Sequence, residues 1–348
     1  MLPNPHASGK TSRAASEPDP THPGPRWRSW AGWVVLSALA VMMARDFDWR
    51  GTVAATAGAD PIWLILALAA NGTILVLATA QWLLFLPEGA WIPGRTMFGI
   101  VAVTSSVSNG GPPLAGHAAG ARLLATRGEL GNAAGVSVTI LDQLAEGMTK
   151  LVVLAAAALF VPGFRYGLAG AFIVLIPALV AGFTLLAHRR DRLGDLAARY
   201  TGAAGSVLRF LAATANHLGP LRRPGHFAVG VLIGVAQKIV EGLAIAAVAV
   251  ALGITLPPWV VLAAVLAVSF STLVAVTPAN LGSYEGSAFL VFRSAGMDTD
   301  SALALAVIQH AAYLIPLAGT GWLWESARLW GRIRSTPAQG SGENDPVR

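Results

Sequence analysis

The sequence predicts an all-α fold, a polytopic bundle of transmembrane helices. Of its 348 residues, 54% are hydrophobic and only 12% are charged, and the mean hydropathy is +0.59. Soluble globular proteins carry about 25% charged residues, so roughly half of the usual surface charge is missing. Long apolar stretches recur along the chain, and membrane helix bundles tolerate the Gly and Pro residues within them. We therefore expect about six full spans plus two re-entrant broken helical hairpins, arranged as an inverted repeat.

The charge and cysteine content excludes several other classes of protein. Lys and Arg number 24 against 18 Asp and Glu, a formal net charge of +6. These cations cluster between apolar runs, where they mark membrane orientation and attract anionic lipid head groups, so we expect no nucleic-acid partner. The chain has no cysteine, which excludes disulfides and thiolate sites. Phosphate-loop, His-Glu-x-x-His, Gly-x-Ser-x-Gly and acidic metal motifs do not occur, so we expect no catalytic residue, no metal, no cofactor and no enzymatic activity.

The chain begins with a polar leader and two predicted spans. Residues 1–26 are rich in Pro, Ser, Gly and His, which predicts a disordered cytoplasmic tail. The apolar stretch 27–44 follows two arginines and reads as an uncleaved first transmembrane helix. Residues 61–86 are nearly uncharged and long enough for a second span, since about 20 residues cross a bilayer. These spans open a single transmembrane domain that we expect over 27–330.

A helix breaker divides the next apolar region into two short arms. Residues 96–108 and 114–126 are each too short to cross about 30 Å of hydrocarbon at about 1.5 Å per residue. Between them lies Asn109-Gly110-Gly111-Pro112-Pro113, a strong turn signal. We expect a re-entrant hairpin here, which a membrane accepts only where the broken backbone is buried in protein or lines a cavity.

Two more spans and an arginine-rich segment follow the first hairpin. Residues 132–161 and 167–187 are apolar and read as the third and fourth spans. The segment 188–225 carries seven arginines, with apolar residues at helical spacing. This pattern predicts an amphipathic helix that lies on the cytoplasmic surface of the membrane.

The last third of the chain has a similar organisation. Residues 227–252 form the fifth predicted span, and 257–292 contain a second broken unit whose arms meet near Pro278. The first arm of this unit is long enough to span, so the unit is either re-entrant or spanning. Residues 302–324 form the last span, and 331–348 are expected to be a disordered tail.

An internal repeat supports the inverted arrangement. A shift of 166 positions (278 − 112) superposes identical residues in one ungapped register: Ser105 on Ser271, Pro112 on Pro278, Gly116 on Gly282, Gly120 on Gly286, Arg127 on Arg293 and Gln143 on Gln309.

If both broken units return to the side from which they came, all arginine clusters lie on one side, which marks the cytoplasm. We therefore expect both termini there, in a multi-pass protein of the cell membrane. The two hairpins then open from opposite sides, a recurring transporter design with its site near the midplane.

Ionisable residues inside the membrane are costly and therefore mark candidate functional positions. Asp142, Glu146 and Lys150 recur at every fourth position of one predicted span and share a face. They either neutralise one another in a ladder that locks two helices together, or line a path for a substrate or for protons. Lys238 and Glu241, three positions apart in the fifth span, pose the same choice.

The hairpins carry a second group of candidates, for substrate binding. Arg122 and His117 lie in the second arm of the first hairpin, where a guanidinium group suits a phosphate. Glu285 lies at the matching depth of the second hairpin. Asn109 and Asn280 are expected to cap the broken helices, with substrate contact as the alternative.

Three further residues have a structural role as their simpler interpretation. His310 is expected to be a core histidine bonded to a neighbouring helix, with a role in the cavity as the alternative. Arg127 and Arg293 are expected to extend their guanidinium groups to the membrane interface.

The segments that contain these residues resemble a known protein family. The segments Val107–Glu129 and Thr277–Gly296 resemble the lysylphosphatidylglycerol synthase transmembrane region family, which includes flippase-like integral membrane proteins. The elements of that resemblance are Asn109, Pro112, Gly116, Arg122, Pro278, Gly282 and Glu285, of which Pro112, Gly116, Pro278 and Gly282 are expected at the helix breaks. The resemblance implies a domain that moves a lipid or lipid-linked molecule between leaflets. Bifunctional members carry a soluble transferase domain after the membrane part, and we expect this chain to correspond to the membrane half alone.

The sequence thus predicts a flippase-like protein with a central polar cavity open to one leaflet at a time. The expected partners are anionic membrane lipids. One rival is an intramembrane lipid-modifying enzyme that uses His117 or His310 with Glu285 or Asp142 as acid–base groups. The other is a non-transporting membrane partner of a lipid or glycan synthase.

Overall fold

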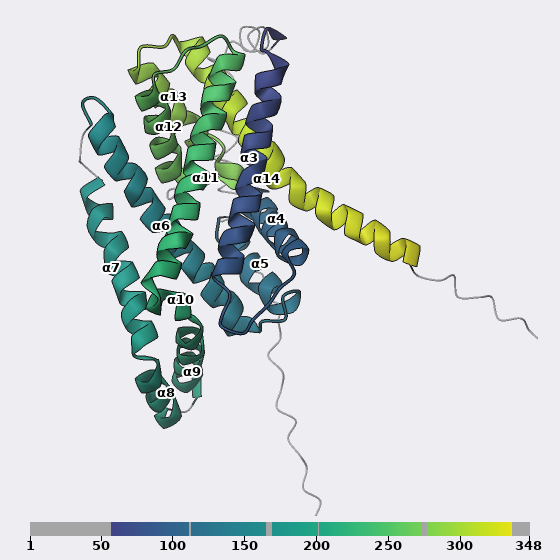
Figure 1. Cartoon of the computed structure of the whole chain (residues 1–348), viewed down its shortest axis with the longest axis vertical. Coiled ribbons are helices and arrows are strands. Elements are labelled where there is room, and N and C mark those ends of the chain that lie inside the picture. Colours follow the sequence, from purple (N-terminus) through teal and green to yellow (C-terminus); the bar gives the residue numbers. More distant parts are fainter. Residues whose placement is uncertain (1–56, 111–112, 165–168, 201, 273–276, 336–348) are drawn as a thin grey trace, which may run out of the picture.

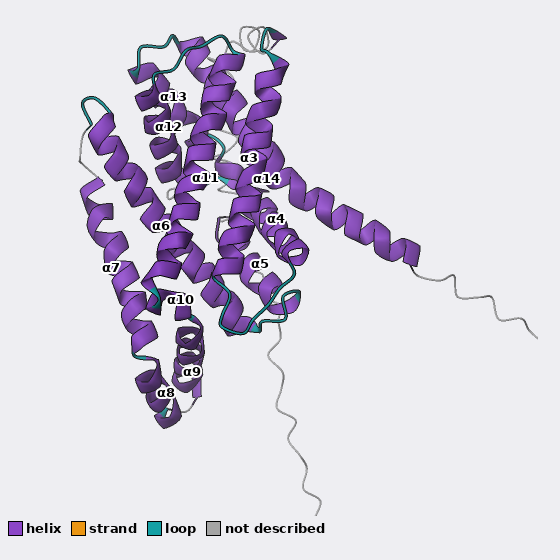
Figure 2. Cartoon of the chain, in the orientation of Figure 1, coloured by secondary structure: helices purple, strands orange, loops and turns teal. Residues whose placement is uncertain are grey.

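The structure is a computed structural model, and it describes residues 57–110, 113–164, 169–200, 202–272 and 277–335. Within these ranges all regular structure is helical (Figure 2), which confirms the predicted all-α transmembrane bundle. The predicted first transmembrane helix at 27–44 and the expected N-terminal tail lie outside the described residues. At the other end the last helix continues to Ser335, into the expected C-terminal tail.

Four of the described helices are long and apolar enough to span a membrane. They are α3 (Pro61–Leu84), α6 (Asn132–Phe160), α11 (Pro224–Ala251) and α14 (Thr299–Ser335). A further apolar helix, α7 (Ala169–His188), runs beside α6 (Figure 1). These helices correspond to predicted spans two to six.

Helices α3 and α11 pack against each other in antiparallel orientation. The backbone N–H of Asp60, which caps the start of α3, donates to the carbonyl of Ala251 at the end of α11 over 2.9 Å. At the opposite end, Arg223 at the start of α11 forms an ion pair of 2.7 Å with Glu88, just after α3. The segments that follow α3 and α11 therefore begin at opposite ends of the bundle.

Two pairs of short helices occupy the positions of the predicted hairpins. The first pair, α4 (Gly94–Gly110) and α5 (Pro113–Thr126), follows α3 and lies beside the lower part of α3 in Figure 1. The second pair, α12 (Pro258–Ser271) and α13 (Ser283–Ser294), follows α11 and lies in the upper half. Because α12 has only 14 residues, it is too short to cross about 30 Å. Helices α12 and α13 pack against each other, as α4 and α5 do, and the re-entrant course of this unit stays a prediction.

Backbone conformation explains the break in the second hairpin. A short turn, η2 (Pro278–Asn280), precedes α13, and Ala279 and Asn280 have φ angles of 58° and 54°. Such left-handed conformations are costly for residues with a Cβ atom. Gly282 follows with φ 83°, a conformation that only glycine adopts easily. The predicted break between Pro278 and Gly282 thus coincides with the observed one.

Gly116, expected to belong to the break of the first hairpin, has another role. It lies inside α5, where an added Cβ atom would collide with the side chain and backbone of Ser108 on α4. Gly116 therefore permits the two arms to approach each other closely. The predicted breaker residue Pro112 lies outside the described residues.

The two halves of the bundle correspond helix by helix. Shifted by 166 positions, α3 would cover 227–250 (61 + 166 to 84 + 166), and α11 covers Pro224–Ala251. The same shift relates α4, α5 and α6 to α12, α13 and α14. Packing follows this exchange: α4 packs on α14 as α12 packs on α6, and α3 packs on α14 as α11 packs on α6. These regularities support a duplicated, inverted architecture, although the repeat itself stays a prediction.

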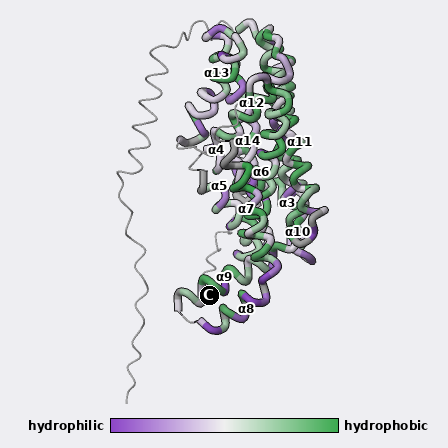
Figure 3. The backbone as a smooth tube through the Cα atoms, turned by 90° about the vertical axis from the view of Figure 1, so that its left-hand side faces the viewer, coloured by the Kyte–Doolittle hydropathy of each residue, from purple (hydrophilic) through white to green (hydrophobic). Residues whose placement is uncertain are grey.

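The arginine-rich segment at 188–225 forms three helices rather than one. Helices α8 (Arg190–Arg199) and α9 (Gly202–His217) pack side by side at the lower end of Figure 1, and α10 (Gly219–Arg222) leads into α11. Figure 3 shows hydrophilic residues concentrated on α8, whereas the bundle helices are largely hydrophobic. The periodicity suggested one continuous helix because it does not register the glycine at the start of α9 or the proline in α10.

Candidate functional site

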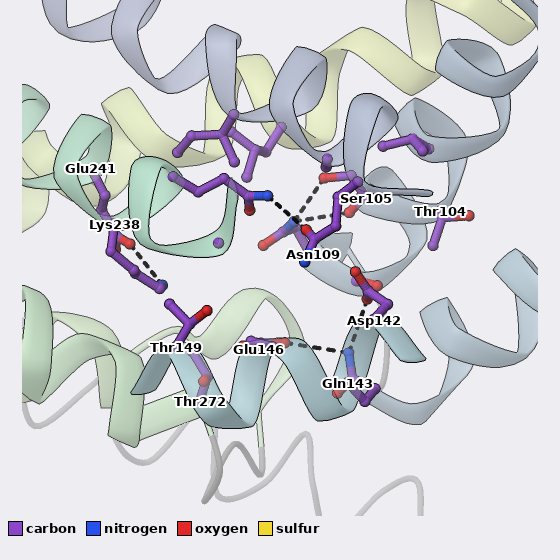
Figure 4. Close-up of a pocket in the computed structure, with 18 of the residues that line it drawn as sticks. Thr104, Ser105, Asn109, Asp142, Gln143, Glu146, Thr149, Lys238, Glu241 and Thr272 are labelled. Carbon is purple, nitrogen blue, oxygen red and sulfur yellow. Dashed lines mark hydrogen bonds and ion pairs between the residues drawn. The ribbon is translucent and has the colours of Figure 1, made fainter. Parts of the chain in front are cut away.

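A polar cavity of about 300 Å³ lies among the helices of the bundle. Its lining comes from α3, α4, α5, α6, α11 and α14 and from the tips of both hairpins (Figure 4). Asn109 and His117 reach it from the first hairpin, and Thr272 and Asn280 reach it from the second. Two broken helical units that begin at opposite ends of the bundle therefore meet at one cavity.

Five charged side chains line this cavity, on only two helices. Asp142, Glu146 and Lys150 lie on α6, and Lys238 and Glu241 lie on α11. Lys150 Nζ lies 2.8 Å from Glu146 Oε1, and Lys238 Nζ lies 2.9 Å from Glu241 Oε2. Pairing is needed because an isolated buried ion costs several kcal/mol of desolvation. Each pair forms within one helix, so the charges line the cavity without bridging α6 to α11.

Asp142 differs from the other two carboxylates of the cavity. No cation of the described residues lies within ion-pair distance of it; instead Gln143 Nε2 donates to its Oδ2 over 3.3 Å, and the Trp82 side chain also forms a hydrogen bond to it. With three carboxylates and two lysines, the ionised cavity has one negative charge in excess, apart from any charge on His117. Asp142 is therefore available to a ligand that supplies a hydrogen-bond donor or a positive charge.

Uncharged side chains connect the helices around the cavity. Gln237 on α11 donates its amide to Gln81 Oε1 over 2.9 Å, and Gln81 donates to the backbone carbonyl of Gly230 over 3.1 Å. Lys150 Nζ lies 3.5 Å from Thr272 Oγ1. The first contacts join α3 to α11, and the last joins α6 to the tip of the second hairpin.

Asn109 forms hydrogen bonds within its own helix and also lines the cavity. Its side-chain amide donates to the carbonyl of Ser105 over 2.9 Å and lies 3.3 Å from Ser105 Oγ. These bonds hold its side chain against the last turn of α4. Asn280 lines the cavity from the opposite hairpin, in the left-handed conformation of the η2 turn.

Glu285 and His310 are not among the residues that line the cavity. They pair with each other: His310 Nδ1 lies 2.7 Å from Glu285 Oε1, and both side chains are buried. The His310 ring also stacks on Tyr284, with centroids 4.2 Å apart. Glu285 Oε2 accepts the backbone N–H of Gly282 over 2.7 Å and so caps α13. Their observed contacts fix the second hairpin to α14.

Arg122 also lies outside the cavity lining, on the exposed side of α5. Five positions separate it from His117, which does face the cavity. At about 100° per residue these two side chains point roughly 140° apart. The sequence placed both on one arm but gave no means of choosing the face that points inward.

Sequence reasoning missed most of the uncharged polar lining. These residues are Gln81, Trp82, Thr104, Ser105, Ser108, Gln143, Thr149, Gln237, Thr272 and Tyr313. Gln81 and Gln237 were detectable, because an amide within an apolar span is unfavourable unless it faces protein or water. The hydroxyl groups carry no comparable signal, since Ser and Thr can bond to the carbonyl four positions earlier in their own helix.

Residues 29–321 match the family model described as Lysylphosphatidylglycerol synthase TM region. The chain belongs to this family. The match confirms the resemblance drawn from the two hairpin segments, and with the four spanning helices it establishes an integral membrane protein. No match to a curated protein was found.

The family corrects one prediction. Because common catalytic motifs do not occur, we expected a protein that is not an enzyme, whereas the family is named for a synthase and is thus related to an enzyme. The expectation was therefore wrong. Local motifs describe phosphate loops, metal clusters and nucleophile turns, and they do not detect polar sites assembled from single residues on several membrane helices.

Proposed function

We propose that this chain is a flippase-like membrane protein that moves an anionic lipid or lipid-linked molecule between leaflets through the charged cavity. One observation carries the proposal: the tips of two hairpins that begin at opposite ends of the bundle line the same cavity. In transporters, such broken elements surround a midplane site that opens alternately to each side. Charged residues inside a membrane are seldom kept without a function.

The distribution of arginine supports an orientation for this transport. Helices α8 and α9 lie at the lower end of Figure 1, and the C-terminal part of α14, which contains Arg328, runs outward and downward from mid-height. Positive charge favours the cytoplasmic side, so we assign that end to the cytoplasm of a cell membrane, together with both chain termini. The first hairpin then begins on the cytoplasmic side and the second on the opposite side.

The mixed charge of the cavity suits a head group that contains phosphate. Lys150 and Lys238 would exchange their carboxylate partners for phosphate oxygens, and Asp142 would accept a hydrogen bond from a hydroxyl or amino group of the same head group. The name of the family refers to a phospholipid that bears lysine, and such a molecule carries both kinds of group.

A second candidate function is participation in lipid modification. It is favoured by the synthase name of the family and by the presence of His117 and Asp142 in one cavity. These two groups would hold and transfer a proton at a bound head group. In this case the lipid would change chemically, whereas transport changes only its leaflet.

The test is reconstitution of the purified chain in vesicles that contain fluorescent phosphatidylglycerol. We expect the protein to raise the rate at which inner-leaflet label becomes accessible to a membrane-impermeant quencher. The double variant Lys150→Gln/Lys238→Gln should lower this rate about tenfold, since two charge-assisted contacts are lost. Because it leaves Glu146 and Glu241 unpaired, its helix content and monodispersity are first matched to those of the unmodified chain. Arg199→Gln on α8, which removes a charge far from the cavity, serves as the control.

Exchange no faster than in protein-free vesicles, over a panel of anionic lipids, would count against transport. The same vesicles distinguish the second candidate, because mass spectrometry of the extracted lipids detects a chemically modified head group. Equal loss of exchange in Arg199→Gln and in the double lysine variant would show that the cavity lysines have no specific part in lipid exchange.

A further inference from the structure

A second polar pocket lies at the base of the first hairpin. Its volume is about 660 Å³, its walls come from α4, α5 and α14, and it shares no lining residue with the central cavity. Three arginines line it. Arg95 lies at the start of α4, Arg127 comes directly after α5, and Arg328 lies in the outer part of α14. This arginine pocket is separate from the charged residues that line the central cavity.

The arginine pocket has an excess of positive charge. Arg127 forks onto the carboxylate of Glu325, with Nη2 3.0 Å from Oε2, and Arg328 Nη1 lies 3.9 Å from the same carboxylate. Arg95 has no carboxylate within ion-pair distance among the described residues. Two guanidinium groups thus share one carboxylate and the third has none, which leaves two positive charges in excess among the described residues of the pocket.

The wall of the arginine pocket is built to hold these groups in place. The indole of Trp324 fits against α4 because residue 99 is glycine, where an added Cβ atom would collide with the ring. Phe98 packs edge-on against this indole, with centroids 5.5 Å apart. Arg95 Cζ lies 5.8 Å from the centre of the Trp324 ring, within the range of a cation–π contact.

Features around the arginine pocket indicate a lipid as its occupant. Leu323 and Leu329, on either side of Trp324 and Arg328 in sequence, are 73% and 55% exposed. In Figure 1 this part of α14 leaves the bundle, so a lipid at the membrane surface can reach it. Arginine and tryptophan together are typical of the level where head groups meet acyl chains, and basic pockets between membrane helices bind anionic head groups.

We propose that the arginine pocket binds the phosphate of an anionic phospholipid from the adjoining leaflet, whose acyl chains lie along the exposed apolar side of α14. Arg95 and Arg328 bind the phosphate oxygens. The guanidinium group of Arg127 also binds the phosphate while it keeps one contact with the carboxylate of Glu325. The proposal does not rest on transport, because occupation of this pocket requires no movement between leaflets.

The experiment measures lipid retention by the delipidated full chain in detergent, with native mass spectrometry. We expect phosphatidylglycerol to bind at least about tenfold more tightly than phosphatidylcholine. Arg95→Gln/Arg328→Gln should abolish that preference for one bound lipid. The control Arg192→Gln/Arg199→Gln removes two exposed charges from α8 and should bind as the unmodified chain does. Glu325→Gln should tighten binding about threefold, because it releases two guanidinium groups.

The increase expected for Glu325→Gln excludes misfolding as an explanation, since a damaged pocket does not gain affinity. Equal binding of the two lipids, or equal losses in the two double arginine variants, would overturn the proposal. A final arm adds inorganic phosphate and glycerol phosphate as competitors. Full displacement of the lipid by either at equimolar concentration would show that the pocket recognises free phosphate, and would overturn the assignment to a membrane lipid.

Discussion

Lys238 and Glu241 show how a charged pair persists within an apolar helix. Glu241 is only 3% exposed, and among the described residues its one ion-pair partner is three positions earlier on α11. A buried pair of this kind contributes little net stability, because desolvation offsets the attraction between the charges. Removing one partner alone is nevertheless damaging, because the other charge is left without compensation.

Lys238→Met should therefore destabilise the folded chain by about 3 kcal/mol, because Glu241 becomes an unpaired buried carboxylate. The double variant Lys238→Met/Glu241→Gln should recover most of that loss. The measurement is the free energy of unfolding in detergent micelles by denaturant titration. If the single variant is as stable as the unmodified chain, Glu241 has a partner or a solvent path that its contacts do not indicate.

Asp142 calls for the opposite expectation, because it lacks a cationic partner among the described residues. Asp142→Asn keeps the shape of the side chain and removes one charge from the cavity. We expect a change in unfolding free energy below about 1 kcal/mol, together with a clear decrease in lipid exchange in vesicles. Unchanged exchange would mean that this carboxylate does not contact the cargo.

At the scale of the elements, the hairpins depend on glycines whose surroundings differ. In α5 an added Cβ atom at Gly120 would press on Trp82 and Thr104, whereas at Gly286 of α13, its partner under the 166-position shift, nothing lies within 4 Å. The two positions are identical in sequence and different in packing. They therefore form a matched pair for testing the first hairpin.

Gly120→Ala should destabilise the chain by about 1–3 kcal/mol, because α5 must move away from α3 and α4. Gly286→Ala should be neutral or stabilise by up to about 1 kcal/mol, because alanine favours the helix and meets no obstacle. Thermal unfolding of the two variants in the same detergent provides the comparison. Equal effects would show that α5 is not packed as tightly as described.

The sequence predicted where the helices begin and end better than it predicted which side of each helix faces the cavity. The break near Pro278 was located, because proline and glycine interrupt a helix for local reasons, whereas residues 111 and 112 of the first predicted break lie outside the described residues. Arg122 was expected at the substrate, yet it points away from the cavity. An arm that is apolar on all sides carries no periodic signal, so its rotation depends on tertiary packing such as that at Gly116 and Gly120.

On the scale of the whole molecule, the helices correspond between the halves and the charges do not. The shift of 166 positions places Lys238 opposite Gly72 and Glu241 opposite Leu75, and it places Asp142 opposite Ile308. Each half thus contributes its charges from a different helix, α6 in one case and α11 in the other. Helix limits and packing could be inferred from an internal repeat, whereas the composition of the cavity could not.

The orientation of the molecule can be checked directly, because the chain has no cysteine. Single cysteines introduced at Ala198 on α8 and at Thr299 at the start of α14 lie in exposed positions at opposite ends of the bundle. With a membrane-impermeant maleimide on intact cells, Thr299→Cys should react, and Ala198→Cys should react only after permeabilisation. The reverse pattern would invert the assigned orientation.

The ion pairs of the cavity have a mechanical consequence, because each lies within one helix. Lys150 and Glu146 move together on α6, as Lys238 and Glu241 do on α11. Tilting one helix against the other therefore breaks neither close ion pair, although it changes the longer-range attraction between Glu146 and Lys238 across the cavity. Among the bonds that such tilting must break are neutral ones, such as Gln237 to Gln81.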